Sequence, residues 1–280
     1  MEFYFKKNLL LGNPISTTAY SKVYKAIDIN SQRTFCVKEI DLSIAPDRRV
    51  KAELLSIIEQ ELEALAISGD AIANVPCLFD SYHDQKGDKF YIIMQWVDGA
   101  PLSQKMNCPT VEFLNYMIKL AKILIELHKL HIYHKDIKPD NIMIKGNDVY
   151  LIDFNISLAL PNLYQGTRGY AAPEMTMRSG EVSREYCDIF SLGVIMYKYF
   201  TGVMPTNGIH YCADLTNPKN KEWASFKTAK EIAKENGTFL RDDINNIITT
   251  CLKKNPTSRY GDLRLFLSEL QKIKRSYNAK

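Results

Sequence analysis

The hydrophobic pattern of the chain changes once, near residues 95–98, and this change limits the folds that the chain can adopt. Before it, short apolar and β-branched stretches alternate with polar turns, which is typical of strands. These stretches are NLLLGNPIS, SKVYKAIDI, RTFCVKEI, CLFDSY and KFYIIMQWV, with one helical pattern, KAELLSIIEQELEALAI, among them. After it, helical spacing dominates, and only IMIK and VYLID interrupt it. The pattern predicts an α+β chain with a small β-rich lobe that holds one helix and a larger, mainly helical lobe.

Composition and charge narrow the function classes. A chain of 280 residues with 46% hydrophobic and 24% charged residues can bury a sizeable core. Its net charge of +4 is too mild to predict a nucleic-acid partner. No apolar run approaches the roughly 18 residues that cross a bilayer, so no membrane partner is expected. The six cysteines are scattered without a CxxC pair, which is typical of free thiols, and the predicted location is cytoplasmic.

The segment HIYHKDIKPDNIMI, followed by VYLIDFN, holds the most informative residues of the chain. Lys138 and Asn141 follow Asp136 between a predicted helix and a short hairpin, and Asp153 stands at the far end of that hairpin. Phosphoryl transfer from a nucleotide uses such a set. One carboxylate takes the acceptor proton, a second carboxylate and an amide oxygen hold magnesium, and a cation steadies the phosphoryl group. The spacing therefore predicts a phosphotransferase site.

Several motifs in order show that the chain resembles the eukaryotic-type protein kinases, from about Leu9 to Tyr260. HKDIKPDN matches HxDxKPxN, GTRGYAAPE matches the activation-segment end with its substrate-docking loop, and DIFSLG matches the helix that anchors the catalytic loop. NPTSRY supplies Arg259, which in the family pairs with the glutamate of APE, here Glu174. The resemblance implies a two-lobed protein-kinase-like fold, with one kinase domain over residues 1–280. Its N-lobe is expected at 1–95, its hinge at 95–98 and its C-lobe at 99–280.

The resemblance also implies a role for each catalytic position. Asp136 is expected to be the catalytic base, Lys138 the phosphate-contacting cation, and Asn141 and Asp153 the ligands of Mg²⁺. Lys38, in FCVKEI, matches the strand lysine that holds the α- and β-phosphates of ATP.

The ion-pair partner of this lysine is expected in the helix that follows. Glu61 is the favoured choice because it places Leu65 one turn on, facing the core. Glu59 and Glu53 remain as alternatives.

ATP is the implied nucleotide. The resemblance implies that Met94 lies beside the adenine and that backbone groups of Gln95 and Val97 lie on the adenine edge. It also implies that three apolar side chains sandwich the ring. The expected nucleotide-binding residues are Ile15, Ser16, Thr18, Ser21, Val23, Cys36, Lys38, Met94, Gln95, Val97 and Met143.

Three departures from the family pattern stand out. Ser16, Thr18 and Ser21 occupy the glycine positions of the nucleotide-binding hairpin, where glycine allows the closest approach of N–H groups to phosphate. We expect weaker nucleotide binding or slower turnover as a result. DFG has become DFN at Asn155, which we expect to be nearly neutral because Asn tolerates positive φ. Lys135 replaces the arginine that usually binds an activation-loop phosphate, which favours an activity independent of phosphorylation at Ser157 or Tyr164.

The favoured function is transfer of the ATP γ-phosphate to a protein Ser or Thr hydroxyl. The Lys138-Pro139 pair and the GTRGYAAPE loop favour Ser/Thr over Tyr. A pseudokinase that binds nucleotide or acts as a scaffold is the alternative, favoured by the glycine loss. A small-molecule kinase would share the Asp-Asn-Asp set but usually lacks the Lys-Pro pair and the APE-like segment. The expected partners are a protein substrate and a regulatory protein acting in trans.

Overall fold

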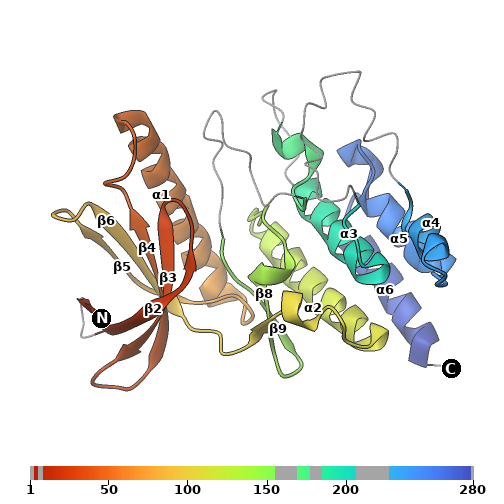
Figure 1. Ribbon diagram of the computed structural model, residues 1–280, viewed down its shortest axis with the longest axis horizontal. Coiled ribbons are helices and arrows are strands. Elements are labelled where there is room, and N and C mark those ends of the chain that lie inside the picture. Colours follow the sequence, from red (N-terminus) through yellow and green to blue (C-terminus); the bar gives the residue numbers. More distant parts are fainter. Residues whose placement is uncertain (1–2, 6–8, 155–168, 177–184, 206–226, 279–280) are drawn as a thin grey trace. The chain divides into compact units, whose positions relative to one another are not determined.

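The structure is a computed structural model that describes residues 3–5, 9–154, 169–176, 185–205 and 227–278. The chain divides into two compact units, Met1–Gly99 and Ala100–Lys280, so the division lies close to the expected hinge. The first unit is rich in strands and the second is mainly helical, which agrees with the expected α+β class (Figure 1). Five of the six cysteines are free thiols, and Cys212 lies outside the described residues.

The N-terminal unit combines an antiparallel sheet with one long helix (Figure 1). The strands lie in the order β1-β2-β3-β4-β6-β5. Their bounds are Phe3–Phe5 for β1, Leu9–Thr17 for β2, Ser21–Asp28 for β3, Thr34–Asp41 for β4, Leu78–Asp84 for β5 and Lys89–Gln95 for β6, and the helix α1 covers Arg48–Ala71. Asp47 caps α1, since its side chain accepts a hydrogen bond of 2.8 Å from the Val50 N–H.

The two faces of this sheet have different roles. One face carries the apolar core of the unit, with Leu11, Ala26, Val37 and Ile93 buried side by side. The opposite face carries Lys38, and α1 packs on that face because its Glu61 contacts Lys38. Leu65 is buried one turn after Glu61, as the helical spacing predicts. Helix α1 therefore contributes both apolar side chains and one buried charge to the sheet.

The C-terminal unit is mainly helical and carries a small sheet at its start (Figure 1). The sheet has the order β7-β8-β9, and α2 packs against α6 while α3 packs against α5. The strand bounds are Ala100–Pro101 for β7, Ile142–Lys145 for β8 and Asp148–Leu151 for β9. The helix bounds are Thr110–Lys129 for α2, Glu185–Thr201 for α3, Ala229–Glu235 for α4, Asp242–Cys251 for α5 and Leu263–Asn278 for α6, with short 3₁₀ helices at Leu102–Lys105, Pro139–Asn141, Pro173–Thr176 and Pro256–Ser258. No helix in the described part of the chain is both long and apolar enough to cross a bilayer.

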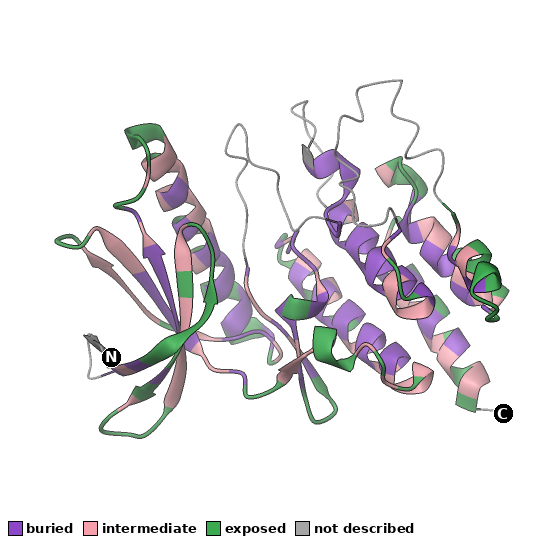
Figure 2. Ribbon diagram, in the orientation of Figure 1, coloured by how far each residue is buried: buried purple, intermediate pink, exposed green. Residues whose placement is uncertain are grey.

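Helix α3 is the most buried helix of this unit, and purple covers most of its length in Figure 2. Its Gly193 faces α5 so closely that an added Cβ would lie 2.5 Å from the Cys251 Cβ. A glycine therefore permits the close approach of the two helices at this point. This packing fixes α3 firmly in the unit, which matters because α3 carries the residues that hold the candidate site.

Three short elements escaped the sequence patterns. Strand β1 covers only Phe3–Phe5, and β7 only Ala100–Pro101. Helix α4 has 7 residues, most of them polar, and buries only Ala229 and Ala233. A capping box between Thr228 and Glu231 begins this helix, with the Thr228 side chain accepting from the Glu231 N–H. Such elements are too short to show a hydrophobic period.

Candidate active site

A buried ion pair joins Lys38 on β4 to Glu61 on α1. The Lys38 Nζ lies 2.7 Å from Oε1 and 2.9 Å from Oε2 of Glu61. Both residues are buried, with exposed fractions of 5% and 2%. Of the three candidate glutamates, Glu61 is therefore the one that contacts Lys38. Glu59 is exposed, and Glu53 pairs with Arg49 instead.

The sheet register places five of the expected nucleotide-binding residues on one face. Val23 is paired with both Ser16 and Lys38, and Cys36 is paired with Met94. Residues directly opposite one another on paired strands share a face, as do residues two apart on one strand. Ser16, Val23, Cys36, Lys38 and Met94 therefore lie on the face to which α1 brings Glu61.

The tip of the β2–β3 hairpin is closed by its own hydroxyl groups. The Thr18 Oγ1 lies 2.8 Å from the Ser21 Oγ and accepts a hydrogen bond of 3.1 Å from the Ser21 N–H. The Thr18 N–H donates to the Ser21 carbonyl at 2.8 Å. The two hydroxyl groups that could have reached a phosphate thus contact each other. Ile15, on β2 three residues before Thr18, is 57% exposed.

The end of β6 presents the residues expected near an adenine. The Gln95 N–H donates to the Cys77 carbonyl at 2.9 Å, and the Val97 carbonyl accepts from the Gly99 N–H at 3.1 Å. These two backbone groups are therefore engaged within the N-terminal unit. Met143, expected to contact the adenine ring, lies half-buried on β8 in the C-terminal unit, opposite Tyr150.

The C-terminal unit gathers Lys138 and Asn141 around Asp136. The Lys138 Nζ donates to the Asp136 Oδ2 at 2.9 Å, and the Asn141 Nδ2 donates to the same oxygen at 3.1 Å. The Asn141 Nδ2 also donates to the Asp136 carbonyl at 2.9 Å. Asp136 is 5% exposed, so its carboxylate is held in one orientation in a largely buried place. Because the amide nitrogen faces Asp136, the Asn141 Oδ1 points away from it.

Asp188, on α3, anchors the backbone just before this carboxylate. Its Oδ1 accepts from the Lys135 N–H at 2.8 Å, and its Oδ2 accepts from the His134 N–H at 3.0 Å. The His128 Nε2 lies 2.8 Å from the same Oδ2. Burial raises the pKa of Asp188, but the hydrogen bond from His128 and the nearby backbone donor outweigh it, so the pKa lies below its ordinary value. Asp188 therefore remains ionised and holds the loop by charge-assisted hydrogen bonds.

Two residues of this region adopt the left-handed backbone conformation. Lys135 has a φ of 63° and Asp153 a φ of 61°. Such a φ costs of order 1 kcal/mol for a residue with a Cβ, so the surroundings must impose it. The anchoring of Lys135 by Asp188 supplies that constraint on one side. On the other, the Ile152 N–H donates to the Asn141 carbonyl at 2.9 Å, which fixes the chain just before Asp153.

The segment that carries Asp153 also packs against the catalytic loop. The His134 Nε2 lies 3.1 Å from the Ile152 carbonyl, and the ring centroids of His134 and Phe154 are 5.0 Å apart. His134 and Phe154 are both fully buried. Asn155, Ser157, Tyr164 and the first three residues of GTRGYAAPE lie outside the described residues.

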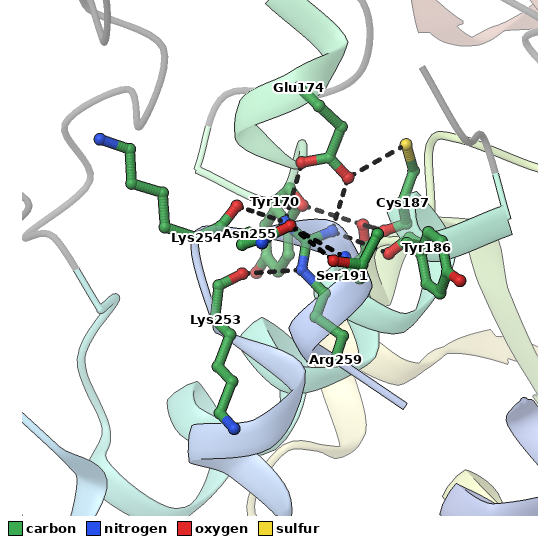
Figure 3. A network of polar contacts seen from close by, with 10 residues as sticks. Tyr170, Glu174, Tyr186, Cys187, Ser191, Lys253, Lys254, Asn255 and Arg259 are labelled. Atoms are coloured by element: carbon green, nitrogen blue, oxygen red, sulfur yellow. Dashed lines mark hydrogen bonds and ion pairs between the residues drawn. The ribbon is translucent and has the colours of Figure 1, made fainter. Parts of the chain in front are cut away.

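A second buried ion pair fixes the end of the docking segment (Figure 3). Arg259 binds Glu174 in a bidentate manner, with Nη1–Oε1 and Nη2–Oε2 distances of 2.5 and 2.8 Å. The Arg259 Nη1 also donates to the Tyr186 carbonyl at 3.0 Å, and Nε to the Lys253 carbonyl at 2.8 Å. The Arg259–Glu174 pair expected from the NPTSRY and APE motifs is therefore present, and it joins the docking segment to α3 and to the chain after α5.

Two features of the site escaped the sequence analysis. His128 was not among the predicted site residues, but its ring is a partner of Asp188. His128 stands six residues before His134. This spacing indicates a shared role only when the structure places Asp188 beside both residues. The mutual contact of Thr18 and Ser21 was also not predicted, because both residues were expected to contact the nucleotide.

Comparisons with known proteins agree with this geometry. The sequence model of the protein kinase domain matches residues 12–272. A probable serine/threonine-protein kinase of Clostridium acetobutylicum is 30% identical over 268 residues, which cover 91% of this chain and 38% of that protein. Serine/threonine-protein kinase PrkC of Bacillus subtilis is 28% identical, over 86% of this chain and 36% of that protein. An Aurora kinase of Schizosaccharomyces pombe is 26% identical, over 89% of this chain and 67% of that protein.

The chain spans little more than a third of the length of the two bacterial relatives. The matched region nevertheless includes every position of the candidate site described above. The chain is therefore a member of the protein kinase family.

Proposed function

We propose that the protein is a serine/threonine kinase that transfers the γ-phosphate of ATP to a hydroxyl group of a protein substrate. The observation that carries this proposal is the convergence of Lys138 and Asn141 on one oxygen of Asp136. A base in phosphoryl transfer must meet the acceptor hydroxyl in a fixed orientation, and two donors on Oδ2 provide it. The names of the bacterial relatives as serine/threonine-protein kinases support the choice of acceptor.

In this proposal each residue has one task. Asp136 receives the proton of the acceptor hydroxyl, and Lys138 balances the charge that moves with the phosphoryl group. Lys38, oriented by Glu61, holds the α- and β-phosphates. The sheet face that carries Ser16, Val23, Cys36 and Met94 contacts the nucleotide, together with Ile15, Thr18, Ser21, Gln95, Val97 and Met143.

Magnesium would be held by Asn141 and Asp153. The donor set fits this ion, because the Asn141 amide oxygen points away from Asp136 and Asp153 adds a carboxylate. Among the described residues no cluster of three His, Cys, Asp or Glu side chains could hold a metal alone. Mg²⁺ commonly binds through one or two protein oxygens, with phosphate oxygens and water completing its shell. When bound, the ion neutralises charge on the phosphates.

A pseudokinase remains the second candidate, and the hairpin tip favours it. The hydroxyls of Thr18 and Ser21 contact each other, and no glycine allows the backbone to approach a phosphate closely. A protein that binds ATP weakly and acts through a partner would tolerate this tip. The intact set of Lys38, Asp136, Asn141 and Asp153 favours the enzyme. In either case we place the protein in the cytoplasm, with a protein substrate or regulatory protein as its partner.

The test is transfer of labelled γ-phosphate from Mg-ATP to the protein itself and to a generic basic protein substrate, beside an Asp136→Ala variant. If the protein is an active kinase, label will appear with the native protein and not with the Asp136→Ala variant. Thermal shift with Mg-ATP is measured on both proteins. A shift without label in the native protein would favour the pseudokinase. Equal label in both proteins would show a contaminating kinase and would remove the support for Asp136 as the base.

A further inference from the structure

Side chains of α3 hold two segments of the candidate active site in place. Asp188 anchors the catalytic loop, and Ser191, three residues later, donates from its Oγ to the Tyr170 carbonyl at 2.9 Å. Lys198 follows Ser191 by seven residues, which is two helical turns, so both side chains leave the helix on nearly the same side. The helix therefore presents Lys198 to the segment that Ser191 holds.

Lys198 contacts that segment directly. Its Nζ donates to the Tyr170 Oη at 3.1 Å and lies 5.8 Å from the centre of the Tyr170 ring. An added Cβ on Gly169 would lie 2.8 Å from the Met204 Cε, just after the end of α3. Gly169 and Tyr170 thus run along α3 from Ser191 to Met204. They belong to the segment that ends in Glu174 and is fixed by Arg259 (Figure 3).

The charge of Lys198 has no acidic partner among the described residues. Other lysines and arginines of this unit, such as Lys138, Lys227 and Arg241, form ion pairs with carboxylates. Lys198 instead has a neutral phenol as its acceptor, and it is half-buried rather than fully solvated. A cation held in place beside a phenol, with its charge not compensated in the described structure, attracts an anionic group that approaches the same segment.

We propose that Lys198 gives this kinase a preference for protein substrates with an anionic side chain near the acceptor hydroxyl. The inference rests on the proposed function, because it assigns a specificity residue to that reaction. Ten residues of α3 separate Lys198 from Asp188, about 15 Å along the helix. An extended peptide covers this distance in about four or five residues. The preferred anion therefore lies within about five residues of the acceptor, as a carboxylate or as a phosphorylated residue.

The test uses the 280-residue chain and a set of serine peptides. Each peptide carries glutamate, glutamine, lysine or phosphoserine at one position, up to about five residues on either side of the acceptor serine. The expected result is a kcat/KM about two- to fivefold higher for glutamate than for glutamine at one position or more. Phosphoserine should raise the ratio further because it carries more charge. A preference for phosphoserine alone would identify a phosphorylated residue as the natural anion.

The Lys198→Gln variant separates recognition from folding. The glutamate-to-glutamine ratio should fall to about one, and Lys198→Glu should reverse it in favour of lysine peptides. Lys272→Glu, an exposed lysine on α6, makes the same change in net charge and should keep the native ratio. A purely structural role of Lys198 would lower both rates equally and leave the ratio intact, which would overturn the inference.

Two further outcomes distinguish a failure of this inference from a failure of the proposed function. Transfer by the native protein with no preference for any anionic peptide would overturn the role of Lys198 and leave the proposed function standing. Absence of transfer to every peptide would overturn the proposed function and this inference with it. Raising the salt concentration should reduce a true charge preference, since screening weakens exposed pairs.

Discussion

The carboxylate of Asp188 lies 2.8 Å from the His128 Nε2, and the same oxygen accepts the His134 N–H that begins the catalytic loop. One buried anion thus joins the end of α2 to the loop that carries Asp136. The carboxylate is fully buried and three donors surround it, so folding stabilises its ionised form.

Asp188→Asn is therefore expected to destabilise the protein in a pH-dependent way. The pKa of Asp188 is lower in the folded protein than its ordinary value of 3.8. Its stabilising contribution is present above that value and is lost as the pH falls through the lower folded pKa. At neutral pH we expect the variant to lose about 3 kcal/mol, because charged hydrogen bonds are replaced. The difference from the native protein should shrink below about pH 4.

Urea unfolding of both proteins between neutral and acidic pH measures this difference. Asp148→Asn is the matched control, since Asp148 is an exposed carboxylate that pairs with Lys119. The control should change stability by less than about 0.5 kcal/mol. A constant deficit for Asp188→Asn at every pH would contradict the role of its charge.

Glu61→Gln is expected to lower both stability and phosphate transfer. The variant keeps the side-chain shape but removes the Glu61 charge from the buried pair with Lys38. Breaking a buried pair from one side costs about 3–5 kcal/mol. Transfer should fall on the order of tenfold or more, because Lys38 loses the carboxylate that orients it. Thermal unfolding and kcat measure the two effects.

Glu59→Gln provides the control for that variant. Glu59 is exposed on the same helix, two residues before Glu61. It should leave both quantities close to those of the native protein. Equal losses in the two variants would show that the helix, and not the ion pair, is responsible.

Thr18→Val is expected to weaken the binding of ATP. The change keeps the branched shape and removes the hydroxyl that accepts from the Ser21 N–H. One hydrogen bond at an exposed turn contributes about 0.5–1.5 kcal/mol, so the KM for ATP should rise about two- to tenfold. The KM for the peptide substrate should change less. Thr18→Ser, which keeps the hydroxyl, should resemble the native protein, and a rise in its KM equal to that of Thr18→Val would rule out the hydroxyl contact.

Gly193→Ala is expected to destabilise the protein although alanine favours helices. The added Cβ would lie 2.5 Å from the Cys251 Cβ and 3.2 Å from Leu252, so α3 and α5 would have to separate. Overpacking costs about 1–3 kcal/mol, against about 1 kcal/mol gained in helix propensity. Gly261→Ala is the control, because an added Cβ there meets nothing within 4 Å. Urea unfolding should show a loss for the first variant and almost none for the second.

The fold and the main positions of the site were predictable from the sequence because they depend on local patterns. The strands, the long helices and the set around Asp136 follow from hydrophobic period and from motif spacing. Glu61 was favoured over Glu59 and Glu53 because it places Leu65 one turn on, facing the core, and Leu65 is indeed buried. These inferences needed only the relation of residues within one element or one loop.

The remaining contacts depend on where distant elements meet. His128 and Asp188 are 60 residues apart, and Tyr170 and Lys198 are 28 apart. Nothing in the spacing of either pair predicts a contact. The Thr18–Ser21 contact is local, but a hydroxyl can serve as donor or acceptor, so the sequence could not decide between a phosphate and a neighbour.

The pair of Glu174 and Arg259 also has a consequence for biosynthesis. The two residues are 85 positions apart, so a growing chain presents Glu174 long before its partner exists. At about 5–20 residues per second, the ribosome needs roughly 4 to 17 seconds to make the intervening segment. During that time the docking segment lacks its guanidinium anchor, and a chaperone that binds nascent chains could occupy it. The segment that carries Glu174 therefore reaches its final conformation only after Arg259 has been synthesised.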